Sequence, residues 1–220
     1  MRKLFPGTRW LLAAVTAAGF TGAAMAAEPV AGQDYEVLDN PVASDLPDDR
    51  ISVTEVFWYG CPHCYDLEAP LESWAEDLPE DVGFERLPAT MGGPSWMKHA
   101  AVFYAAQDVG IFSEAFHRDF FDAIHQDGQR LTDNDDIADF FAEYGADREE
   151  TIASLDSFGV KSQLNQATAR MKSYELMGVP ALVVDGRYVI TPQSAQGLSN
   201  MIEVADALVE KTRQEQQSDS

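Results

Sequence analysis

A pair of cysteines placed between a strand and a helix is the feature that most constrains this chain. Residues 51–59 are rich in β-branched and aromatic side chains, which predicts a buried central strand. Gly60 comes next, then Cys61-Pro62-His63-Cys64, and apolar residues recur at helical spacing over residues 65–78. Pro62 suits the first turn of that helix, where its missing N–H leaves no hydrogen bond unmade. The order of strand, cysteine pair and helix predicts an α/β fold.

Strand character recurs on both sides of this unit. Further strands are expected at residues 34–38, 82–87, 181–184 and 187–191. Pro88 ends the second of these, and Asp185-Gly186 is a strong hairpin turn between the last two. A final amphipathic helix is expected over about residues 194–211. The chain therefore has the order β-α-β and then β-β-α.

A helical segment of about 70 to 80 residues separates the two parts, and its length argues against a loop. Helical periodicity runs through residues 95–177 without β-branched runs. Thr132 and Asp147 are plausible N-caps, each followed by an acid three residues later. The expected breaks between helices are Gly110, Gly128, Gly145 and Gly159.

The first 26 residues have the composition of a secretory signal peptide. Arg2, Lys3 and Arg9 supply a basic start, an apolar run covers residues 10–20, and small residues precede an expected cleavage between Ala26 and Ala27. The alternative is an uncleaved anchor. No later segment has the roughly 18 consecutive apolar residues of a membrane span. We therefore expect a protein exported to an oxidising compartment, where a cysteine pair forms a disulfide.

The exported part of the chain is strongly acidic. Without the leader it has 12 Lys and Arg against 37 Asp and Glu, a net charge of −25, compared with −22 for the whole chain. Nucleic-acid binding needs clustered basic residues, so this composition argues against it. Two cysteines also cannot supply an all-cysteine zinc site or an ordinary iron–sulfur cluster.

Cys61 lies where a helix begins, and unpaired backbone N–H groups there stabilise an anion. This lowers the thiol pKa, and the thiolate is the species that reacts in disulfide exchange. His63, when protonated, adds positive charge beside the same sulfur. Stabilising the thiolate stabilises the reduced form, so the Cys61–Cys64 disulfide becomes a stronger oxidant.

Two alternative roles for the cysteine pair fit the sequence less well. An inert structural disulfide across so short a loop would remove little entropy from the unfolded chain. A zinc site would need two histidines from elsewhere, and none has ligand-like spacing. The histidines considered are His99, His117 and His125.

A proline at the start of a late strand is the second element of the site. Gly178-Val179-Pro180-Ala181 precedes the strand at residues 181–184. A trans bond is the usual state before proline. Because the cysteine pair is present, we expect a cis Val179–Pro180 bond close to the sulfurs. The backbone N–H and C=O of Val179 could then pair with an extended segment of another protein that serves as the substrate, or client.

These residues resemble periplasmic thiol–disulfide oxidoreductases of the DsbA type over essentially the whole exported chain. The Cys-Pro-His-Cys pair together with valine before the proline is specific, since thioredoxin-like reductases usually carry Gly-Pro between the cysteines. DsbC-type isomerases have threonine before the proline and a separate dimerisation domain. The other matching motifs are Gln33-Asp34-Tyr35, Phe57-Trp58-Tyr59-Gly60, Met91-Gly92-Gly93, Val160-Lys161-Ser162 and Asn200-Met201.

The resemblance implies an α/β thioredoxin fold with an inserted all-helical domain. The thioredoxin-like domain would comprise residues 27–92 and 178–212, the insertion residues 93–177, and a polar tail residues 213–220, after a signal peptide at 1–26.

The resemblance also implies residue roles. Cys61 would be the nucleophile and Cys64 the buried resolving cysteine, with His63 stabilising the thiolate and Val179-Pro180 forming the cis-proline loop. Pro62 supports the active site within the motif.

Two acids match family positions that tune proton transfer around the buried sulfur. Glu55 lies in an apolar strand, so it should be paired or protonated unless that strand is exposed at an edge. Glu68 could equally lie on a solvated helix face. In the family, a basic residue of the next strand is the partner of these acids. Glu85 and Arg86 both align with that position, and we expect Arg86 because it carries a positive charge.

The implied activity is donation of the Cys61–Cys64 disulfide to unfolded exported proteins with free cysteines, in the periplasm. A monomer without metal or other cofactor is expected, reoxidised by a DsbB-type membrane quinone oxidoreductase. Rival hypotheses are a periplasmic reductase or isomerase and a non-enzymatic chaperone or client-binding module. Phe57, Trp58 and Tyr59 would line a client surface or fill the core.

The acidity predicts a stability that depends on salt. We expect the melting temperature of the exported protein to rise from low to molar salt, because counter-ions screen repulsion among surface carboxylates. Thermal unfolding followed by circular dichroism measures this. A flat melting temperature would count against the interpretation.

Overall fold

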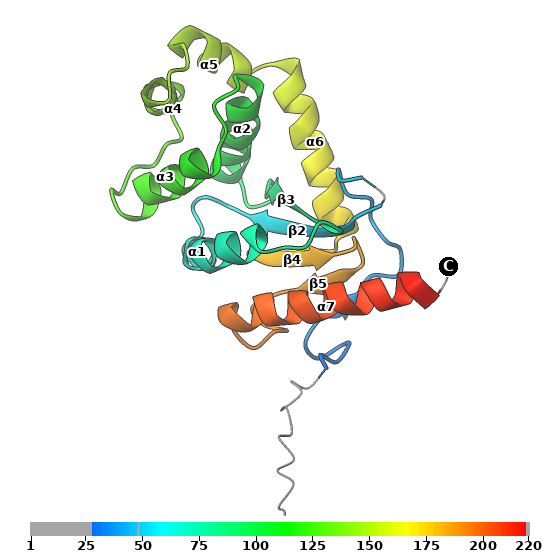
Figure 1. Ribbon diagram of the computed structural model, residues 1–220. Helices are drawn as coiled ribbons and strands as arrows, with labels where there is room; N and C mark the ends of the chain where they lie inside the picture. Colours follow the sequence, from blue (N-terminus) through cyan, green and yellow to red (C-terminus); the bar gives the residue numbers. More distant parts are fainter. Residues whose placement is uncertain (1–27, 48, 219–220) are drawn as a thin grey trace, which may run out of the picture.

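The computed structural model describes residues 28–47 and 49–218 (Figure 1). The proposed signal peptide and its cleavage site lie outside the described residues. Within the described ranges, no helix is long and apolar enough to cross a membrane.

Five strands, counted over the described residues, form one mixed sheet in the order β1-β5-β4-β2-β3. Central strand β2 is parallel to β3 and antiparallel to β4, and β5 is antiparallel to both β4 and β1. Every residue of β2 is buried, as its apolar sequence predicts. The strands are β1 (Glu36–Val37), β2 (Ile51–Phe57), β3 (Val82–Pro88), β4 (Ala181–Val184) and β5 (Tyr188–Ile190).

The strands differ from expectation at their ends. Strand β1 has two residues, because the carboxylate of Asp34 accepts the Val30 N–H at 2.8 Å within a turn. Strand β2 ends at Phe57, two residues before the expected end. Pro88 belongs to β3 instead of ending it, which an edge strand tolerates because its outer N–H positions need no partner.

Helices cover both faces of the sheet. Helices α1 (Pro62–Glu76) and α7 (Leu198–Ser218) contact each other and pack on one face (Figure 1). Helix α6 (Phe158–Ser173) packs on the other. Alternate residues of β4 serve the two cores: Leu182 faces α1 and α7, whereas Val183 faces α6. This three-layer arrangement confirms the predicted α/β class.

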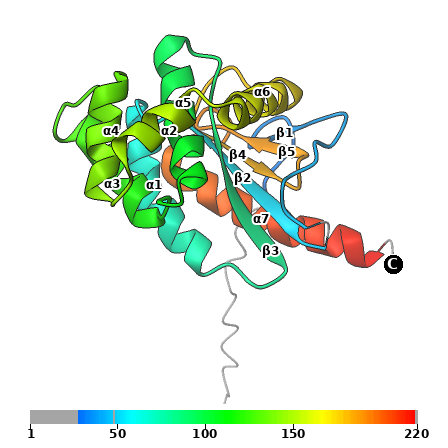
Figure 2. The same cartoon turned by 90° about the horizontal axis from the view of Figure 1, so that it is seen from above.

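The remaining helices form the insertion, seen from above in Figure 2. They are α2 (Pro94–Asp108), α3 (Glu114–His125), α4 (Asn134–Glu143) and α5 (Arg148–Leu155), and α6 returns the chain to the sheet. Their core is rich in aromatic side chains, and Phe57 and Tyr59 extend into it from the end of β2. The insertion therefore meets the sheet at the end where the cysteine pair lies.

The helix boundaries confirm part of the prediction. Breaks at Gly110, Gly128 and Gly145 are confirmed, each glycine having positive φ. Gly159 lies in the first turn of α6, so the break expected at Gly159 is wrong. The break between α5 and α6 comes earlier in the chain, and Ser157 is the N-cap at which α6 begins.

Of the two expected caps, Asp147 is confirmed at α5. The cap at Thr132 is wrong. Asp133 caps α4 by accepting the Asp135 N–H at 2.9 Å.

The last helix begins and ends later than expected. Ser194 forms a hydrogen-bonded turn with Thr191, whose N–H donates to Ser194 Oγ at 3.0 Å, so α7 starts at Leu198. It continues to Ser218. Arg213 Nε lies 2.6 Å from Asp81 Oδ2, and Lys211 Nζ lies 2.9 Å from Glu215 Oε1, so its polar end is supported by ion pairs.

The hairpin turn supports a stability prediction. Gly186 has φ +60°, and a Cβ there would overlap the carbonyl oxygen of Val42. Gly128 has φ +71° with open space around it. We expect G128A to lose about 1–2 kcal/mol of unfolding free energy from the left-handed backbone alone. G186A should lose about 1–3 kcal/mol more because backbone must move.

Urea unfolding of the two variants measures the difference. Equal losses would mean that the contact between the hairpin and residue 42 adjusts without cost.

Candidate active site

The cysteine pair lies where the polypeptide passes from β2 to α1. Cys61 is the N-cap of α1 and Pro62 is its first residue, which confirms the expected position of the proline. Cys61 is 7% exposed and Cys64 is fully buried. The backbone N–H of Cys64 points to Cys61 Sγ at 3.4 Å, and both cysteines are free thiols in this structure.

The environment favours a thiolate at Cys61. A hydrogen bond from the Cys64 thiol is the largest influence, and it lowers the pKa of Cys61 to about 6 against the opposing effect of burial. The backbone N–H groups of Cys64 and His63, and the charge of His63, act in the same direction. His63 itself is exposed.

The environment of Cys64 has the opposite effect. Burial raises its pKa strongly, and the hydrogen bond to Cys61 and the negative charges of Cys61 and Glu55 raise it further. In the reduced state the pair therefore holds one thiolate and one thiol. This asymmetry suits thiol–disulfide exchange, in which one sulfur is exposed to attack and the other leaves.

The second predicted element lies beside the first. The Val179–Pro180 peptide bond is cis, as expected. Cys61 Sγ lies 3.7 Å from the carbonyl oxygen of Val179, 118 residues away in the sequence. The fold thus brings the cysteine pair and the proline loop into contact.

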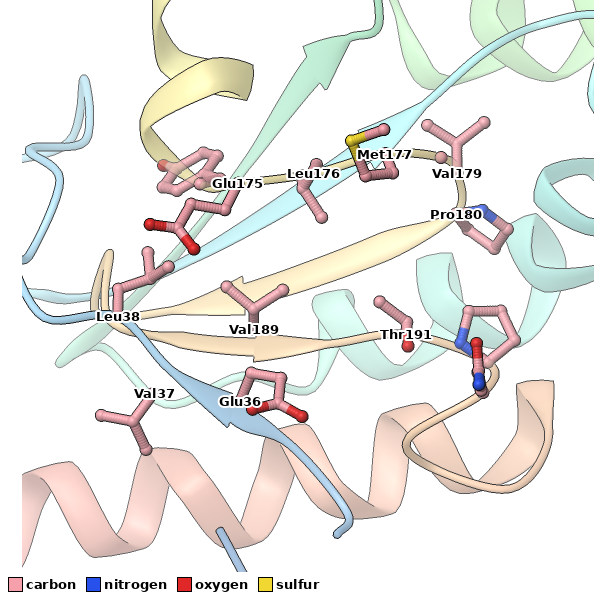
Figure 3. A pocket seen from close by; sticks show the side chains of 14 residues that line it. Glu36, Val37, Leu38, Glu175, Leu176, Met177, Val179, Pro180, Val189 and Thr191 are labelled. Atoms are coloured by element: carbon pink, nitrogen blue, oxygen red, sulfur yellow. The ribbon is translucent and has the colours of Figure 1, made fainter. Parts of the chain in front are cut away.

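A groove of about 670 Å³ begins at the proline loop and follows β5 toward β1 (Figure 3). Met177, Val179 and Pro180 lie along one side, and Val37 of β1 and the adjacent Leu38 lie on the other. Met177 is 99% exposed. An apolar surface is therefore available beside the reactive sulfur.

Two acids and an arginine are buried beneath the cysteines. Glu55 is fully buried on β2 and Glu68 is buried on α1, so the exposed alternatives for both are wrong. Arg86 Nε lies 3.1 Å from Glu55 Oε2, and Arg86 Nη2 lies 2.7 Å from Glu68 Oε1. Its Nη1 lies 2.8 Å from a carboxylate oxygen of half-exposed Glu114 on α3.

Strand register decides between the two candidates for the basic partner. Arg86 is opposite Glu55 in the parallel β2–β3 pair, and Glu85 is opposite Thr54. Successive residues of a strand point to opposite faces, so Arg86 faces the acids and Glu85 faces away. Glu85 accepts the Thr54 hydroxyl at 2.7 Å and pairs with Arg170 of α6.

The two acids differ in their affinity for protons. Burial, reinforced by the charge of Glu68, raises the pKa of Glu55 well above its usual range, although Arg86 opposes this. Burial also disfavours ionised Glu68, but His117 and Arg86 outweigh it and lower the pKa of Glu68. Of the two acids, Glu55 therefore holds its proton more tightly than Glu68 does.

His117 is the contributor that the sequence analysis missed, having considered it only as a possible zinc ligand. It is fully buried on α3, with Nε2 3.4 Å from Glu68 Oε2 and Nδ1 2.8 Å from the hydroxyl of Tyr59. A histidine on the apolar helix face that carries Phe120 and Phe121 was the available signal. Its partners, 49 and 58 residues away, could not be read from that pattern.

The structure does not place the cysteines in a group of residues with metal-binding spacing, within the part of the chain that it describes. Among the described residues, the one group with metal-binding spacing is Glu55, Glu68 and His117, which includes no cysteine. Arg86 already places a positive charge against both of its carboxylates. His99 instead contacts the carbonyl of Arg130, and His125 that of Tyr59.

The aromatic residues after Glu55 mostly serve the core. Phe57 and Tyr59 are fully buried, so they do not form a client surface. Trp58 is partly exposed and stacks on Trp96 of α2, with ring centroids 4.6 Å apart. Trp58 alone of the three could contact a client.

The fold and the site define the class of this protein. A β-α-β and β-β-α sheet, a Cys-x-x-Cys at the start of the first helix and a cis-proline against its first sulfur make it a thioredoxin-fold thiol–disulfide oxidoreductase.

Comparisons with known proteins narrow the class to a family. The model of the DSBA-like thioredoxin domain matches residues 67–209. The thiol:disulfide interchange protein DsbA of Pseudomonas syringae pv. tomato is 41% identical over 203 residues, which cover 91% of this chain and 94% of that protein. The DsbA of Pseudomonas aeruginosa is 39% identical over 194 residues, 88% of this chain and 90% of that one.

Comparison with solved structures indicates the same family. The crystal structure of Pseudomonas aeruginosa DsbA matches with a TM-score of 0.79 at 38% identity, covering 86% of this chain and 96% of that one. DsbA of Xylella fastidiosa matches with a TM-score of 0.78 at 30% identity, covering 84% and 98%. The chain belongs to the DsbA family, with the expected thioredoxin fold and helical insertion.

The asymmetry of the cysteines predicts a titration. Thiolate absorbance of the reduced protein should rise with a midpoint at about pH 6, the value to which the Cys61 pKa is lowered. C64A removes the strongest hydrogen-bond donor and should raise the midpoint. H63A should raise it less, because the charge of His63 is the weakest of the contributions.

The lowered pKa of Cys61 also determines how the stability of the reduced protein changes with pH. Because the folded pKa is depressed, the reduced protein gains stability that is complete above the ordinary thiol pKa of about 9 and is lost as pH falls through about 6. A midpoint near the ordinary value in the wild type would contradict the assignment.

Proposed function

We propose that this protein is a dithiol oxidase, which donates a Cys61–Cys64 disulfide to free cysteines of newly exported, unfolded proteins in the periplasm. The observation that carries the proposal is the position of Cys61 at the start of α1, with the Cys64 N–H 3.4 Å and the Val179 carbonyl oxygen 3.7 Å from its sulfur, next to a fully buried Cys64. These surroundings lower the pKa of Cys61 and raise that of Cys64. Stabilising the thiolate stabilises the reduced form, which makes the disulfide a stronger oxidant. The leader-like residues 1–26 support export.

The reaction uses the two sulfurs in turn. A client thiolate attacks Cys61 Sγ, the Cys61–Cys64 bond breaks, and Cys64 leaves with the electron pair of that bond. A second client thiolate then attacks the client sulfur of the mixed disulfide, which forms the client disulfide and releases Cys61 as a thiolate. The client is oxidised by two electrons and the enzyme is reduced by two.

Cys64 needs a proton when it leaves, because a buried thiolate without a partner is unfavourable. Protonated Glu55 is the reserve: Glu55 becomes a carboxylate against Arg86 as Cys64 becomes a thiol. Arg86 Nε, 3.1 Å from Glu55 Oε2, compensates the new charge. The roles of Cys61, Cys64, His63, Glu55 and Glu68 are thus part of this proposal.

Client recognition is assigned to the proline loop and its surroundings. The Val179 backbone next to the sulfur suits pairing with an extended client segment. Exposed Met177 offers a flexible apolar contact that adapts to many sequences. We further propose that the protein acts as a monomer, without metal or other cofactor, and is reoxidised by a DsbB-type membrane quinone oxidoreductase.

Oxidative refolding tests the proposal. The oxidised protein should restore activity to a reduced, unfolded disulfide-containing enzyme, and C61S should abolish this because the attacked sulfur is gone. Retained oxidation by C61S would instead support a non-enzymatic client-binding module. A redox equilibrium with glutathione near that of thioredoxin would support the reductase or isomerase.

A further inference from the structure

His117 belongs to the buried acid cluster, yet the exchange reaction itself assigns it no role. It comes from α3 and reaches the cluster through a shell of aromatic rings. The nearest are those of Phe57 at 4.9 Å, Tyr59 at 5.0 Å and Phe121 at 5.2 Å between ring centroids. An imidazole enclosed in this way has few partners, so each contact it makes constrains its protonation.

The titratable and charged groups around His117 come from four elements and a loop. They are Glu55 on β2, Tyr59 after β2, Glu68 on α1, Arg86 on β3 and Glu114 on α3. Burial, aided by Arg86, lowers the pKa of His117, whereas Glu68 and Glu114 oppose this. A neutral imidazole results, with one ring nitrogen protonated.

Tyr59 selects which nitrogen carries that proton. Burial raises the pKa of Tyr59 well above its usual value, so the phenol keeps its hydrogen. The hydroxyl lies 2.8 Å from Nδ1 of His117 and can donate to it. With Nδ1 as acceptor, the proton lies on Nε2, which is 3.4 Å from Glu68 Oε2, close enough for electrostatic attraction although the geometry is not that of a hydrogen bond.

The charges of the buried groups explain why this matters. Arg86 is one cation against two fully or largely buried carboxyl groups, Glu55 and Glu68. While Cys61 and Cys64 form a disulfide, ionising both acids would leave one buried negative charge without a partner. The two acids therefore give up their protons one after the other, and a donor directed at only one of them decides the order. The second proton leaves only when the Cys64 thiolate, itself a buried negative charge, takes it.

We propose that His117 is a positioning residue that decides which buried acid is ionised. Fixed by Tyr59, its Nε2–H holds Glu68 as the carboxylate, so the proton stays on Glu55. This inference rests on the proposed function, because a proton held on Glu55 matters for catalysis only when Cys64 leaves during disulfide exchange. Glu55 loses the proton that Cys64 gains, and neither His117 nor Glu68 changes its protonation.

Carboxyl NMR titration tests this directly. Oxidised protein carrying ¹³C at the glutamate carboxyl carbons is titrated, with Glu55 and Glu68 assigned from E55Q and E68Q. The oxidised form has no titrating thiol. In wild type, Glu55 should titrate above its ordinary range and Glu68 below it. The result does not depend on oxidation of any client, so it stands apart from a failure of the proposed function.

H117F removes the donor while keeping a ring in the aromatic shell. The midpoint of Glu68 should rise and that of Glu55 should fall by at least about one pH unit, a roughly tenfold change in proton affinity. H117Q should restore the wild-type order, because its amide can donate to Glu68 and accept from Tyr59. H99F is the matched control, a buried histidine bonded to the Arg130 carbonyl, and should leave both midpoints unchanged.

Two results would overturn the inference: wild-type midpoints in folded H117F, or equal shifts in H117F and H117Q, which would point to packing. If H117F does not fold, H117M, which also lacks a ring N–H, decides the question. Loss of the Nε2–H donor should again raise the midpoint of Glu68 and lower that of Glu55. Unchanged midpoints in H117M would refute the role of His117.

Discussion

The contact of Arg86 with two buried carboxyl groups is the constraint on which the rest of the active site depends. A carboxylate buried beside an apolar core is unfavourable without a partner, and one guanidinium compensates one negative charge fully. Glu55 and Glu68 therefore cannot behave alike, even though both contact the same arginine. In the proposed mechanism, this unequal pair supplies the proton that Cys64 takes when it leaves.

The same principle of unequal partners applies to the cysteines. Cys61 is at the end of a helix among hydrogen-bond donors, whereas Cys64 lies one turn deeper in the apolar core. Position along one helix thus separates the pKa values of two chemically identical groups. In each pair, the two acids and the two thiols, the surroundings make one member lose its proton more readily than the other.

Much of this was predictable from sequence because it depends on local patterns. The apolar run of β2, the proline in the first turn of α1 and the glycines between helices act over a few residues. The choice of Arg86 over Glu85 rested on charge, and its physical reason is the register of β2 against β3. His117 was missed because its contacts join α3 to α1 and to the end of β2, and periodicity carries no information about such pairings. The errors at Thr132 and Gly159 were local, since a neighbouring Asp133 or Ser157 offered a better cap.

The helical insertion is attached to the sheet by polar and charged side chains on both faces of the β2–β3 pair. Glu114 and His117 of α3 reach the acid cluster on one face, and Arg170 of α6 pairs with Glu85 on the other. A hinge movement of the insertion would separate these partly or fully buried groups, so the contacts oppose such a movement. The sheet and the insertion also cannot be treated as two exchangeable modules. A thioredoxin-like sheet joined to a different insertion would keep its cysteines but lose the contacts of Glu114 and His117 with the buried acids and Arg86.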